Sequence, residues 1–457
     1  MSAASPWLSL AQLTDGVAAG EIDTVVVAMA DMQGRLQGKR FDAHHFLEEV
    51  VGHATEGCSY LLAVDVDMNT VGGYRLSSWE TGYGDFVLRP DLSTLRPLPW
   101  HRGSAICHAD VTWEDGTPVE QSPRRVLQRQ VARLSERGWT ALGATELEFI
   151  VFEDTYEAAA DGGYRNLTPA NRYNVDYSIL GTSRLEPLLG RIRREMAAAG
   201  MRVESVKGEC NFGQHEMAFR YDDLVAKADE HCLFKLGTKE IAAQEGYSIT
   251  FMAKYNEREG NSCHIHLSLR DEDDRPVFAA DGHDDRRPMS PVFEHFLAGL
   301  LSSAAELTLL YAPNVNSYKR YAAGSFAPTA IAWGRDNRTC AFRVVGHGPS
   351  LRVECRVAGG DVNPYLALSG LVAGGLHGVE QELPLEEELR GNAYLSGAPR
   401  LPKTLSEAAE LFESSTLARN SFGDEVVDHY VNMARVELAA FEGAVTDWER
   451  SRGFERL

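Results

Sequence analysis

The sequence predicts an α+β protein, in which a small β-rich domain precedes a large domain built on an antiparallel sheet. Three observations support this prediction. The chain has 457 residues, which exceeds the size at which a single hydrophobic core stops growing. β-Branched runs separated by turns dominate residues 15–107. From Ser122 onward, helical spacing of apolar residues alternates with strands, and the charged residues suited to chemistry lie on those strands.

The small domain, expected over residues 15–107, begins with a hairpin. Residues 24–30 form the β-branched run TVVVAMA, the turn D-M-Q-G follows at residues 31–34, and the chain returns through residues 35–41. Two further strands are expected, at Ser59–Val66 and at Phe86–Leu88. Prolines then mark the exit from this domain.

The large domain, expected over residues 108–457, alternates helices with strands. The expected elements are a helix from Ser122 to Gly138, a strand carrying Glu146 and Glu148, a helix at residues 184–199, a long helix at about 223–244, a strand carrying His264 and His266, a helix at 291–310, arginine-rich strands between residues 330 and 357, and a helical C-terminal third. Ser122 followed by proline is a helix start, and Thr404 with Glu407 is a capping box.

Composition excludes several classes of partner. The net charge of −21 argues against nucleic acid or an anionic membrane as the main partner. The seven cysteines are odd in number and scattered without a C-x-x-C, which favours reduced thiols in a cytosolic protein. The N-terminus lacks the pattern of a signal peptide, and no apolar stretch is a clean membrane span. A cytoplasmic, soluble protein is therefore expected.

Carboxylates and imidazoles recur at the spacing that places them on one face of a strand. Glu146 with Glu148, and His264 with His266, are each two residues apart. The candidate metal ligands are Glu146, Glu148, Glu209, Glu216, His264 and Glu354. An oxygen-rich set with one imidazole suits Mg²⁺ or Mn²⁺ better than structural zinc. A solvated strand face is the alternative, but apolar neighbours such as Leu147 argue against it.

The second half of the chain concentrates arginines, although the protein is acidic overall. The cluster consists of Arg320, Arg338, Arg343, Arg352 and Arg356. A guanidinium binds a carboxylate or phosphate through two parallel hydrogen bonds, so a phosphate-binding site is one interpretation. Ion pairing with the acidic surface is the alternative for any single arginine. The sequence has neither a Walker-type loop nor a G-x-G-x-x-G motif, so a nucleotide would be held by other means.

Together these motifs resemble those of the glutamine synthetase family, and the likeness covers nearly the whole chain. The matching motifs are Glu146-x-Glu148, Gly213-Gln214-His215-Glu216, Asn316-Ser317-Tyr318-Lys319-Arg320, Asn337-Arg338-Thr339, Arg352-Val353-Glu354-Cys355-Arg356 and Asn363-Pro364-Tyr365. The resemblance implies an N-terminal β-grasp domain and a glutamine-synthetase-type catalytic domain on a curved antiparallel sheet. It also implies a homo-oligomer of two stacked hexameric rings, a dodecamer, with active sites between neighbouring subunits.

The resemblance further implies an ATP-dependent ligase. ATP phosphorylates the γ-carboxylate of L-glutamate, and an amine then displaces phosphate to form a γ-amide. Two or three Mg²⁺ or Mn²⁺ ions are expected per active site: Glu148, Glu209 and Glu216 would hold one, and Glu146, His264 and Glu354 another.

The same resemblance assigns roles to the arginines. Arg320 and Arg356 would bind the carboxylates of glutamate beside Gly260, and Arg338 would be catalytic by stabilising the transferring phosphoryl group. The residues expected on the nucleotide side are Glu204, His266, Ser268, Arg343 and Arg352. Tyr394 is a loose counterpart of the tyrosine that is adenylylated in some members of the family, but its sequence context departs from the family pattern.

Two departures from the family pattern bear on the amine. Ammonia-using members carry a glutamate in a Gly-x-Glu-Ala-Pro flap, where it attracts ammonium and accepts its proton. Here Phe326 takes that position, and a phenyl ring does neither, so an organic amine is expected in place of ammonium. The second departure is Glu259, which precedes Gly260. It would bind the amine or act as its catalytic base; a solvated loop glutamate is the alternative.

The chain thus resembles the γ-glutamyl-amine branch of the family, and most of all the actinobacterial glutamate–ethanolamine ligases. The expected reaction joins glutamate to ethanolamine, in amine catabolism or detoxification. No acidic run marks a tunnel for a polyamine, whereas Trp79, Tyr83 and Phe326 offer an aromatic wall for a short cation, unless they only pack. The alternatives are a γ-glutamylpolyamine synthetase acting on putrescine or spermidine, and a catalytically silent structural or regulatory oligomer.

Overall fold

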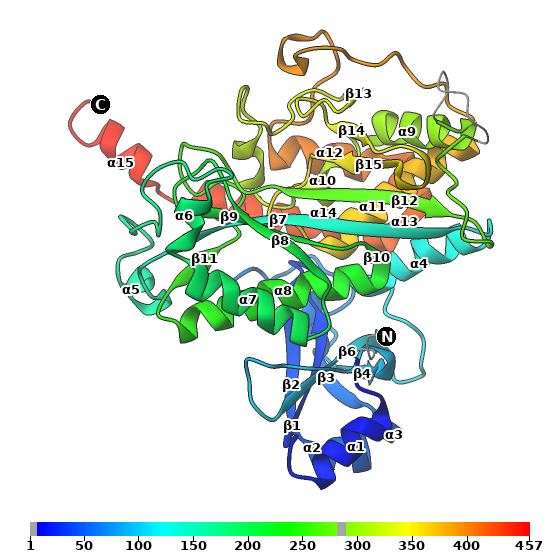
Figure 1. Ribbon diagram of the computed structural model, residues 1–457, viewed down its shortest axis with the longest axis vertical. Helices are drawn as coiled ribbons and strands as arrows, with labels where there is room; N and C mark the ends of the chain where they lie inside the picture. The colour runs from blue at the N-terminus through cyan, green and yellow to red at the C-terminus, as the bar shows by residue number, and fades with distance from the viewer. Residues whose placement is uncertain (1–6, 281–288) are drawn as a thin grey trace.

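A computed structural model describes residues 7–280 and 289–457. Two sheets organise the chain, and Figure 1 shows the smaller one, in blue, below the larger one, with helices α7 (Glu186–Ala198) and α8 (Leu224–Gln244) between them. The mixed α and β architecture agrees with the predicted fold class. None of the helices in the described ranges is long and apolar enough to cross a membrane.

The smaller sheet has the strand order β2-β1-β6-β4-β3, with β5 also paired to β6. Its strands are β1 (Thr24–Ala30), β2 (Leu36–Asp42), β3 (Thr55–Cys58), β4 (Asp85–Pro90), β5 (Arg96–Pro97) and β6 (Ser104–Thr112). β1 and β2 form the predicted hairpin, and β1 runs parallel to β6 at the centre of the sheet. The division expected between residues 107 and 108 falls inside β6, which pairs with β1 and β4 as far as Thr112.

The strand predicted at Ser59–Val66 is wrong. Residues 55–58 form β3, and residues 59–62 form a 3₁₀ turn. Ser59, Leu62 and Ala63 are all buried. Positions separated by three and four residues share one face of a helical turn, whereas in a strand they would alternate between faces. The burial of this segment therefore follows a helical period.

The larger sheet has the order β13-β14-β15-β12-β7-β9-β8, and β10 and β11 also pair with β7. Its strands are β7 (Thr140–Phe152), β8 (Val203–Gly208), β9 (Gln214–Phe219), β10 (Asp222–Asp223), β11 (Ser248–Thr250), β12 (Cys263–Arg270), β13 (Trp333–Arg335), β14 (Phe342–Val345) and β15 (Arg352–Cys355). Neighbouring strands are antiparallel, as predicted, except for the parallel pair β13 and β14.

Helices pack beneath and behind this sheet (Figure 1). The remaining longer helices are α1 (Leu10–Ala18), α4 (Pro123–Ser135), α9 (Pro291–Ser303), α11 (Pro364–Glu380), α12 (Leu405–Ser414), α13 (Thr416–Phe422), α14 (Asp424–Gly443) and α15 (Asp447–Gly453). The short ones are α2 (Ala43–His45), α3 (Val51–His53), α5 (Tyr156–Asp161), α6 (Ile179–Ser183) and α10 (Thr308–Tyr311). α4 and α8 contact β7, and α11 contacts α4, α8 and α9. The core thus lies between the sheet and these helices.

Two helix predictions need correction. The helix expected at residues 291–310 is interrupted, because tight three-residue turns at Ala304 and Thr308 separate α9 from α10. The capping box at Thr404 is half formed: its hydroxyl accepts a hydrogen bond from the Glu407 amide (3.1 Å), but the Glu407 carboxylate accepts from the Lys403 amide instead.

A buried polar cluster joins the smaller sheet to α4 and α8. The Arg124 guanidinium donates to Asp229 on α8 (3.1 Å), to Asp110 on β6 (2.5 Å) and to Asp91 just after β4 (2.8 Å). The Tyr365 hydroxyl also donates to Asp229, at 2.5 Å. His108 on β6 lies 3.8 Å from the same carboxylate and is fully buried. One arginine therefore connects three carboxylates from different parts of the chain.

Candidate active site

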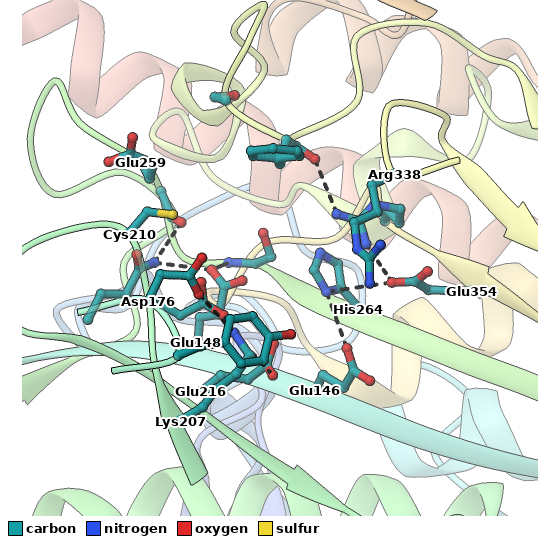
Figure 2. A pocket seen from close by; sticks show the side chains of 18 of the residues that line it. Glu146, Glu148, Asp176, Lys207, Cys210, Glu216, Glu259, His264, Arg338 and Glu354 are labelled. Atoms are coloured by element: carbon teal, nitrogen blue, oxygen red, sulfur yellow. Dashed lines mark hydrogen bonds and ion pairs between the residues drawn. The ribbon is translucent and has the colours of Figure 1, made fainter. Parts of the chain in front are cut away.

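A cavity of about 270 Å³ opens over the middle of the larger sheet. Its lining includes Glu146, Glu148, Asp176, Tyr177, Lys207, Glu209, Cys210, Gln214, Glu216, Glu259, Gly260, Ser262, His264, Ser325, Phe326, Arg338, Arg343, Glu354 and Arg356. All six carboxylates and imidazoles expected to bind metal are in this set. Figure 2 shows five of them, Glu146, Glu148, Glu216, His264 and Glu354, projecting into a common space from β7, β9, β12 and β15; the sixth, Glu209, follows β8.

Strand register brings the first group of ligand candidates together. Glu146 on β7 is paired across the sheet with His264 on β12. The His264 Nδ1 lies 3.4 Å from Glu146 Oε2 and 3.7 Å from Glu354 Oε1 (Figure 2). One donor atom from each of these three residues lies within 4.8 Å of the others. The expected trio of Glu146, His264 and Glu354 therefore has the proximity that a shared cation requires.

A second group forms beside the first. Glu148 on β7 is directly opposite Glu216 on β9. The Glu148 carboxylate accepts hydrogen bonds from the Ser262 amide (2.7 Å) and from Gln214 Nε2 (3.1 Å), which fix its orientation. Its oxygen, one from Glu216 and a nitrogen of His264 also lie within 4.8 Å of one another. The structure thus joins Glu148 and Glu216 as expected.

Glu209 lies beyond the end of β8 and belongs to a different group from the one expected. Its carboxylate clusters with Asp176 and Cys210 and accepts a hydrogen bond from Lys207. The Lys207 ammonium is 3.8 Å from both Glu216 and Asp176. Sequence reasoning missed Lys207, although it stands two residues before Glu209 and therefore faces the same way.

The electrostatics of the cavity fit a cation. Burial raises the pKa of Glu148 to about 8 and that of Glu216 to about 9, because nearby carboxylates add to the cost of ionisation. Burial alone would also raise the pKa of Glu354, but His264 and Arg356 outweigh it and lower that pKa to about 2. Burial lowers the pKa of His264 to about 4, so its imidazole is neutral at physiological pH. Buried carboxylates with a neutral imidazole are a donor set suited to Mg²⁺ or Mn²⁺.

Arginines line the wall opposite β7. Arg343 and Arg356 both donate to Glu354, at 2.9 and 2.5 Å, and Arg356 also reaches the carbonyl of Phe326 at 3.4 Å. Arg338 is exposed and makes no hydrogen bond or ion pair with the parts of the chain that the structure describes. Its guanidinium is therefore available to an incoming anionic group.

Arg320 lies elsewhere than expected for a glutamate ligand. It is 1% exposed and is absent from the cavity lining among the described residues. Its guanidinium donates to the backbone carbonyls of residues 356–358 and, at 3.3 Å, to the Ser262 hydroxyl. The Tyr321 hydroxyl and the Cys263 amide also donate to the carbonyls of residues 357 and 358, so Arg320 is one of several groups that hold the chain just after β15, where Arg356 lies.

A second cavity of about 470 Å³ lies beside the first. It is lined by Leu142, Ala144, Glu146, Glu204, Ala218, Phe219, Tyr221, His266, Leu267, Ser268, Arg270, Pro349, Ser350 and Arg352. Four of the five residues expected on the nucleotide side are among them; Arg343 instead lines the first cavity, because it is paired with Glu354 across β14 and β15. Glu146 lines both cavities, and its Oε1 is 3.0 Å from His266 Nε2.

Phe326, Glu259 and Gly260, three residues that bear on the amine, also line the first cavity. Phe326 is 56% exposed and has a φ of +58°, a strained backbone conformation for an aromatic residue. The Glu259 Oε2 is buried and has no hydrogen-bond partner among the described residues. A side chain at Gly260 would lie 2.3 Å from the Ala253 carbonyl, so only glycine fits there. Trp79 and Tyr83 contact each other, with ring centroids 5.1 Å apart, but do not line this cavity.

Comparison with known proteins identifies the family. Residues 120–453 match the sequence profile of the glutamine synthetase catalytic domain. The chain belongs to the glutamine synthetase family. It is 65% identical, over 99% of its length and 97% of the relative, to a γ-glutamylethanolamide synthetase of Streptomyces coelicolor. It is 35% identical, over 96% and 97% of the two chains, to a glutamate–isopropylamine ligase of a Pseudomonas species.

A solved structure agrees with this assignment. The complex of GmaS with ADP superimposes with a TM-score of 0.85 and 26% identity, over 97% of this chain and 99% of that one. Members of the glutamine synthetase family use ATP and divalent metal ions, and their substrates are glutamate and amines. The resemblance inferred from the motifs is therefore confirmed, and so is the glutamine-synthetase-type fold.

Proposed function

We propose that this chain is an ATP-dependent ligase that joins the γ-carboxylate of L-glutamate to ethanolamine, giving γ-glutamylethanolamide, ADP and phosphate. The observation that carries the proposal is the composition of the cavity: a cluster of carboxylates suited to divalent cations, with the phenyl ring of Phe326 in the same lining. The 65% identity to a γ-glutamylethanolamide synthetase supports ethanolamine as the amine.

The carboxylate floor fits divalent cations. Glu146, His264 and Glu354 would hold one ion, and Glu148 and Glu216, with Glu209 nearby, another; Mg²⁺ or Mn²⁺ suits these ligands. When bound, such ions would neutralise the negative charge that develops in phosphoryl transfer. Two or three ions per site is our expectation. Gln214 and the Ser262 amide orient Glu148, which keeps its second oxygen free for a ligand.

In the first half-reaction, an oxygen of the glutamate γ-carboxylate attacks the γ-phosphorus of ATP, and ADP leaves. The residues proposed to hold the nucleotide are Glu204, His266, Ser268 and Arg352 in the second cavity. Arg338, which has no protein partner in the described structure, stabilises the transferring phosphoryl group. Arg356 binds a glutamate carboxylate. Arg320 holds Arg356 in place, because its guanidinium donates a hydrogen bond to the backbone carbonyl of Arg356 (3.1 Å).

In the second half-reaction, the amine nitrogen attacks the carbonyl carbon of γ-glutamyl phosphate. Phosphate leaves, and the nitrogen loses a proton to a base. We assign this role to Glu259, because it lines the same cavity and its Oε2 has no hydrogen-bond partner among the described residues, with the Arg258 guanidinium 3.9 Å away. Phe326 offers an apolar face to the carbon chain of the amine in place of a carboxylate that would attract ammonium.

We also propose a domain boundary and an assembly for this chain. We place the β-grasp domain at the N-terminus and begin the catalytic domain after β6, which ends at Thr112. The assembly proposed is a cytoplasmic dodecamer with active sites between subunits, by analogy with the family.

The test measures phosphate release and amide formation from ATP, glutamate and Mg²⁺ with ammonium, methylamine, ethanolamine, putrescine and spermidine. We expect ethanolamine to give the highest kcat/KM and one amide for each phosphate. Higher activity with putrescine or spermidine would favour a polyamine ligase. The absence of amide with every amine would overturn the proposal and favour a structural or regulatory role.

A further inference from the structure

A surface segment, residues 389–400, lies behind the wall of the first cavity; we call it the brace. None of its residues is among the described residues that line that cavity. Two loops that do line the cavity are nevertheless bonded to it: the turn carrying Arg338, and the flap, residues 324–328, which carries Phe326. The brace therefore touches the proposed catalytic machinery only from behind.

Bonds from the brace hold the flap. The Tyr394 hydroxyl donates to the carbonyl of Ala327, the residue after Phe326, at 3.0 Å. Arg400 donates to the Thr329 hydroxyl at 3.2 Å. The backbone continues the contact, because the amide of residue 331 donates to the carbonyl of residue 399 at 2.8 Å. The C-terminal side of the flap is thus tied to the brace by side chains and backbone together.

Other bonds hold the turn that carries Arg338. The Asn337 side-chain amide donates to the carbonyls of Leu389 (3.1 Å) and Gly391 (2.8 Å). The Ala393 amide donates to the Thr339 hydroxyl at 3.0 Å. Arg338 itself, between these two anchored neighbours, points into the cavity (Figure 2). The flap and the turn that carries Arg338 are therefore both hydrogen-bonded to the brace.

The brace is internally connected. Arg400 donates to the carbonyls of Tyr394 (3.2 Å) and Ser396 (2.8 Å), which closes the segment on itself. Ala393 is fully buried in a small apolar cluster with Ala330, Ala332 and Cys340. The Arg400 side chain thus ties the C-terminal end of the brace to its middle.

Phe326 needs such support. Its φ of +58° is disfavoured for a residue with a side chain, and its ring is 56% exposed. Among the described residues, its own carbonyl accepts a single long bond, 3.4 Å, from Arg356. The Tyr394 hydroxyl makes the shorter contact, one residue further on. Burial raises the pKa of Tyr394, so the hydroxyl remains a proton donor at neutral pH.

We propose that Tyr394 is a positioning residue: its hydroxyl latches the flap so that Phe326 stays over the cavity while the acyl phosphate awaits the amine. This inference rests on the proposed function. With the latch released, water reaches the acyl phosphate and its oxygen bonds to the carbonyl carbon. The bond from that carbon to the phosphate oxygen then breaks, and glutamate and phosphate are released without amide.

The decisive variant is Tyr394→Phe, which removes only the hydroxyl. We expect hydrogen exchange of the backbone amides in residues 322–330 to rise roughly fivefold, the effect of losing one typical neutral hydrogen bond. With ethanolamine, we expect the excess of phosphate over amide and the KM for the amine to rise by a similar factor, while the KM for ATP stays unchanged. Arg400→Met, which releases Thr329 and the brace carbonyls, should act in the same direction.

The matched control is Tyr156→Phe. Its hydroxyl also donates to a backbone carbonyl, that of Ile249 at 3.1 Å, but it lies outside the cavity lining. Flap exchange and coupling should be unchanged in this variant. Wild-type flap exchange in Tyr394→Phe would overturn the latch. Because exchange is measured without substrates, it still tests the latch if the wild-type protein forms no amide, a result that would refute only the proposed function.

Discussion

Glu146 is the residue on which the two cavities meet. It lies opposite His264 in the first cavity and 3.0 Å from His266 in the second. The interaction with these two imidazoles outweighs burial and lowers its pKa well below the usual range, so the carboxylate is ionised at neutral pH. A single charged group therefore serves the acid-lined cavity and the proposed nucleotide cavity.

Removing this carboxylate should abolish the reaction. We expect Glu146→Ala and His264→Ala to lower kcat by at least roughly 100-fold and to weaken Mn²⁺ binding in a calorimetric titration, because each removes a proposed metal ligand. The elution volume in size-exclusion chromatography should not change. Glu153→Ala, an exposed glutamate just after β7, is the control and should behave as wild type. Near-normal turnover in either ligand variant would contradict the metal assignment.

Phe326 should set the preference for the amine. Phe326→Glu restores a carboxylate that attracts ammonium and accepts its proton, so the ratio of kcat/KM for ammonium to that for ethanolamine should rise by about tenfold, equivalent to about 1.4 kcal/mol. Phe326→Leu keeps an apolar side chain and should bring no gain with ammonium. If both variants keep the wild-type preference, the flap residue does not choose the amine.

Residues on strands were predictable, and residues whose role depends on distant contacts were not. Glu146 could be placed on one face with Glu148, and His264 on one face with His266, from their spacing alone. Arg320 resembled a substrate ligand in sequence, yet it satisfies buried carbonyls of residues 356–358, which belong to another segment. Lys207 was missed because nothing in a lone lysine signals that three carboxylates converge on it.

At the scale of elements, β7 organises the site. It pairs with β9 on one side and β12 on the other, and the register fixes Glu148 opposite Glu216 and Glu146 opposite His264. A shift of one residue would turn both glutamates to the opposite face of the sheet. The alternation along β7 was visible in the sequence, but its partners and register were not, because they depend on strands more than 60 residues away.

The junction between the smaller sheet, α4 and α8 should depend on Arg124. Arg124→Met removes the guanidinium that donates two hydrogen bonds to the fully buried Asp229, so we expect the free energy of unfolding to fall by about 3–5 kcal/mol in urea titrations. Arg193→Met, which breaks an exposed pair with Glu186 on α7, is the control and should cost less than about 1 kcal/mol. Equal losses in the two variants would show that the buried cluster contributes no more than a surface pair.

At the scale of the whole molecule, stability should depend on pH through His108. Burial lowers its pKa from 6.5 to about 4, although Asp229 opposes this and Arg96 and Arg124 reinforce it. The unfolded chain therefore binds more protons between pH 4 and 6.5, and the folded state loses stability as pH falls through this window. The contribution amounts to about 3 kcal/mol.

His108→Gln removes this titration, so the slope of unfolding free energy against pH between 4 and 6.5 should become shallower than in the wild type. The exposed His53→Gln is the control and should leave the slope unchanged. An unaltered slope in His108→Gln would mean that other groups account for the pH dependence.

The prediction of secondary structure succeeded for segments whose pattern of apolar residues extends over many residues, and it failed for short segments. The hairpin β1–β2, α4 and α8 follow from extended patterns. The segment at Ser59–Leu62 did not, because four residues are too few to distinguish a helical period from a strand. The end of the smaller sheet at Thr112 depends on pairing with β4, which no local pattern reveals.

The two halves of the proposed reaction rest on different kinds of backbone. Glu146, Glu148 and His264, proposed to activate glutamate, stand on hydrogen-bonded strands, whereas Glu259 and Phe326, proposed to receive the amine, stand on loops. Loops accept substitution with less effect on their surroundings than central strands do. A combinatorial library confined to residues 257–259 and 325–327 would thus change which amine the protein accepts as nucleophile. The strand residues that phosphorylate glutamate would stay unchanged. This scaffold is therefore a starting point for the synthesis of chosen amides.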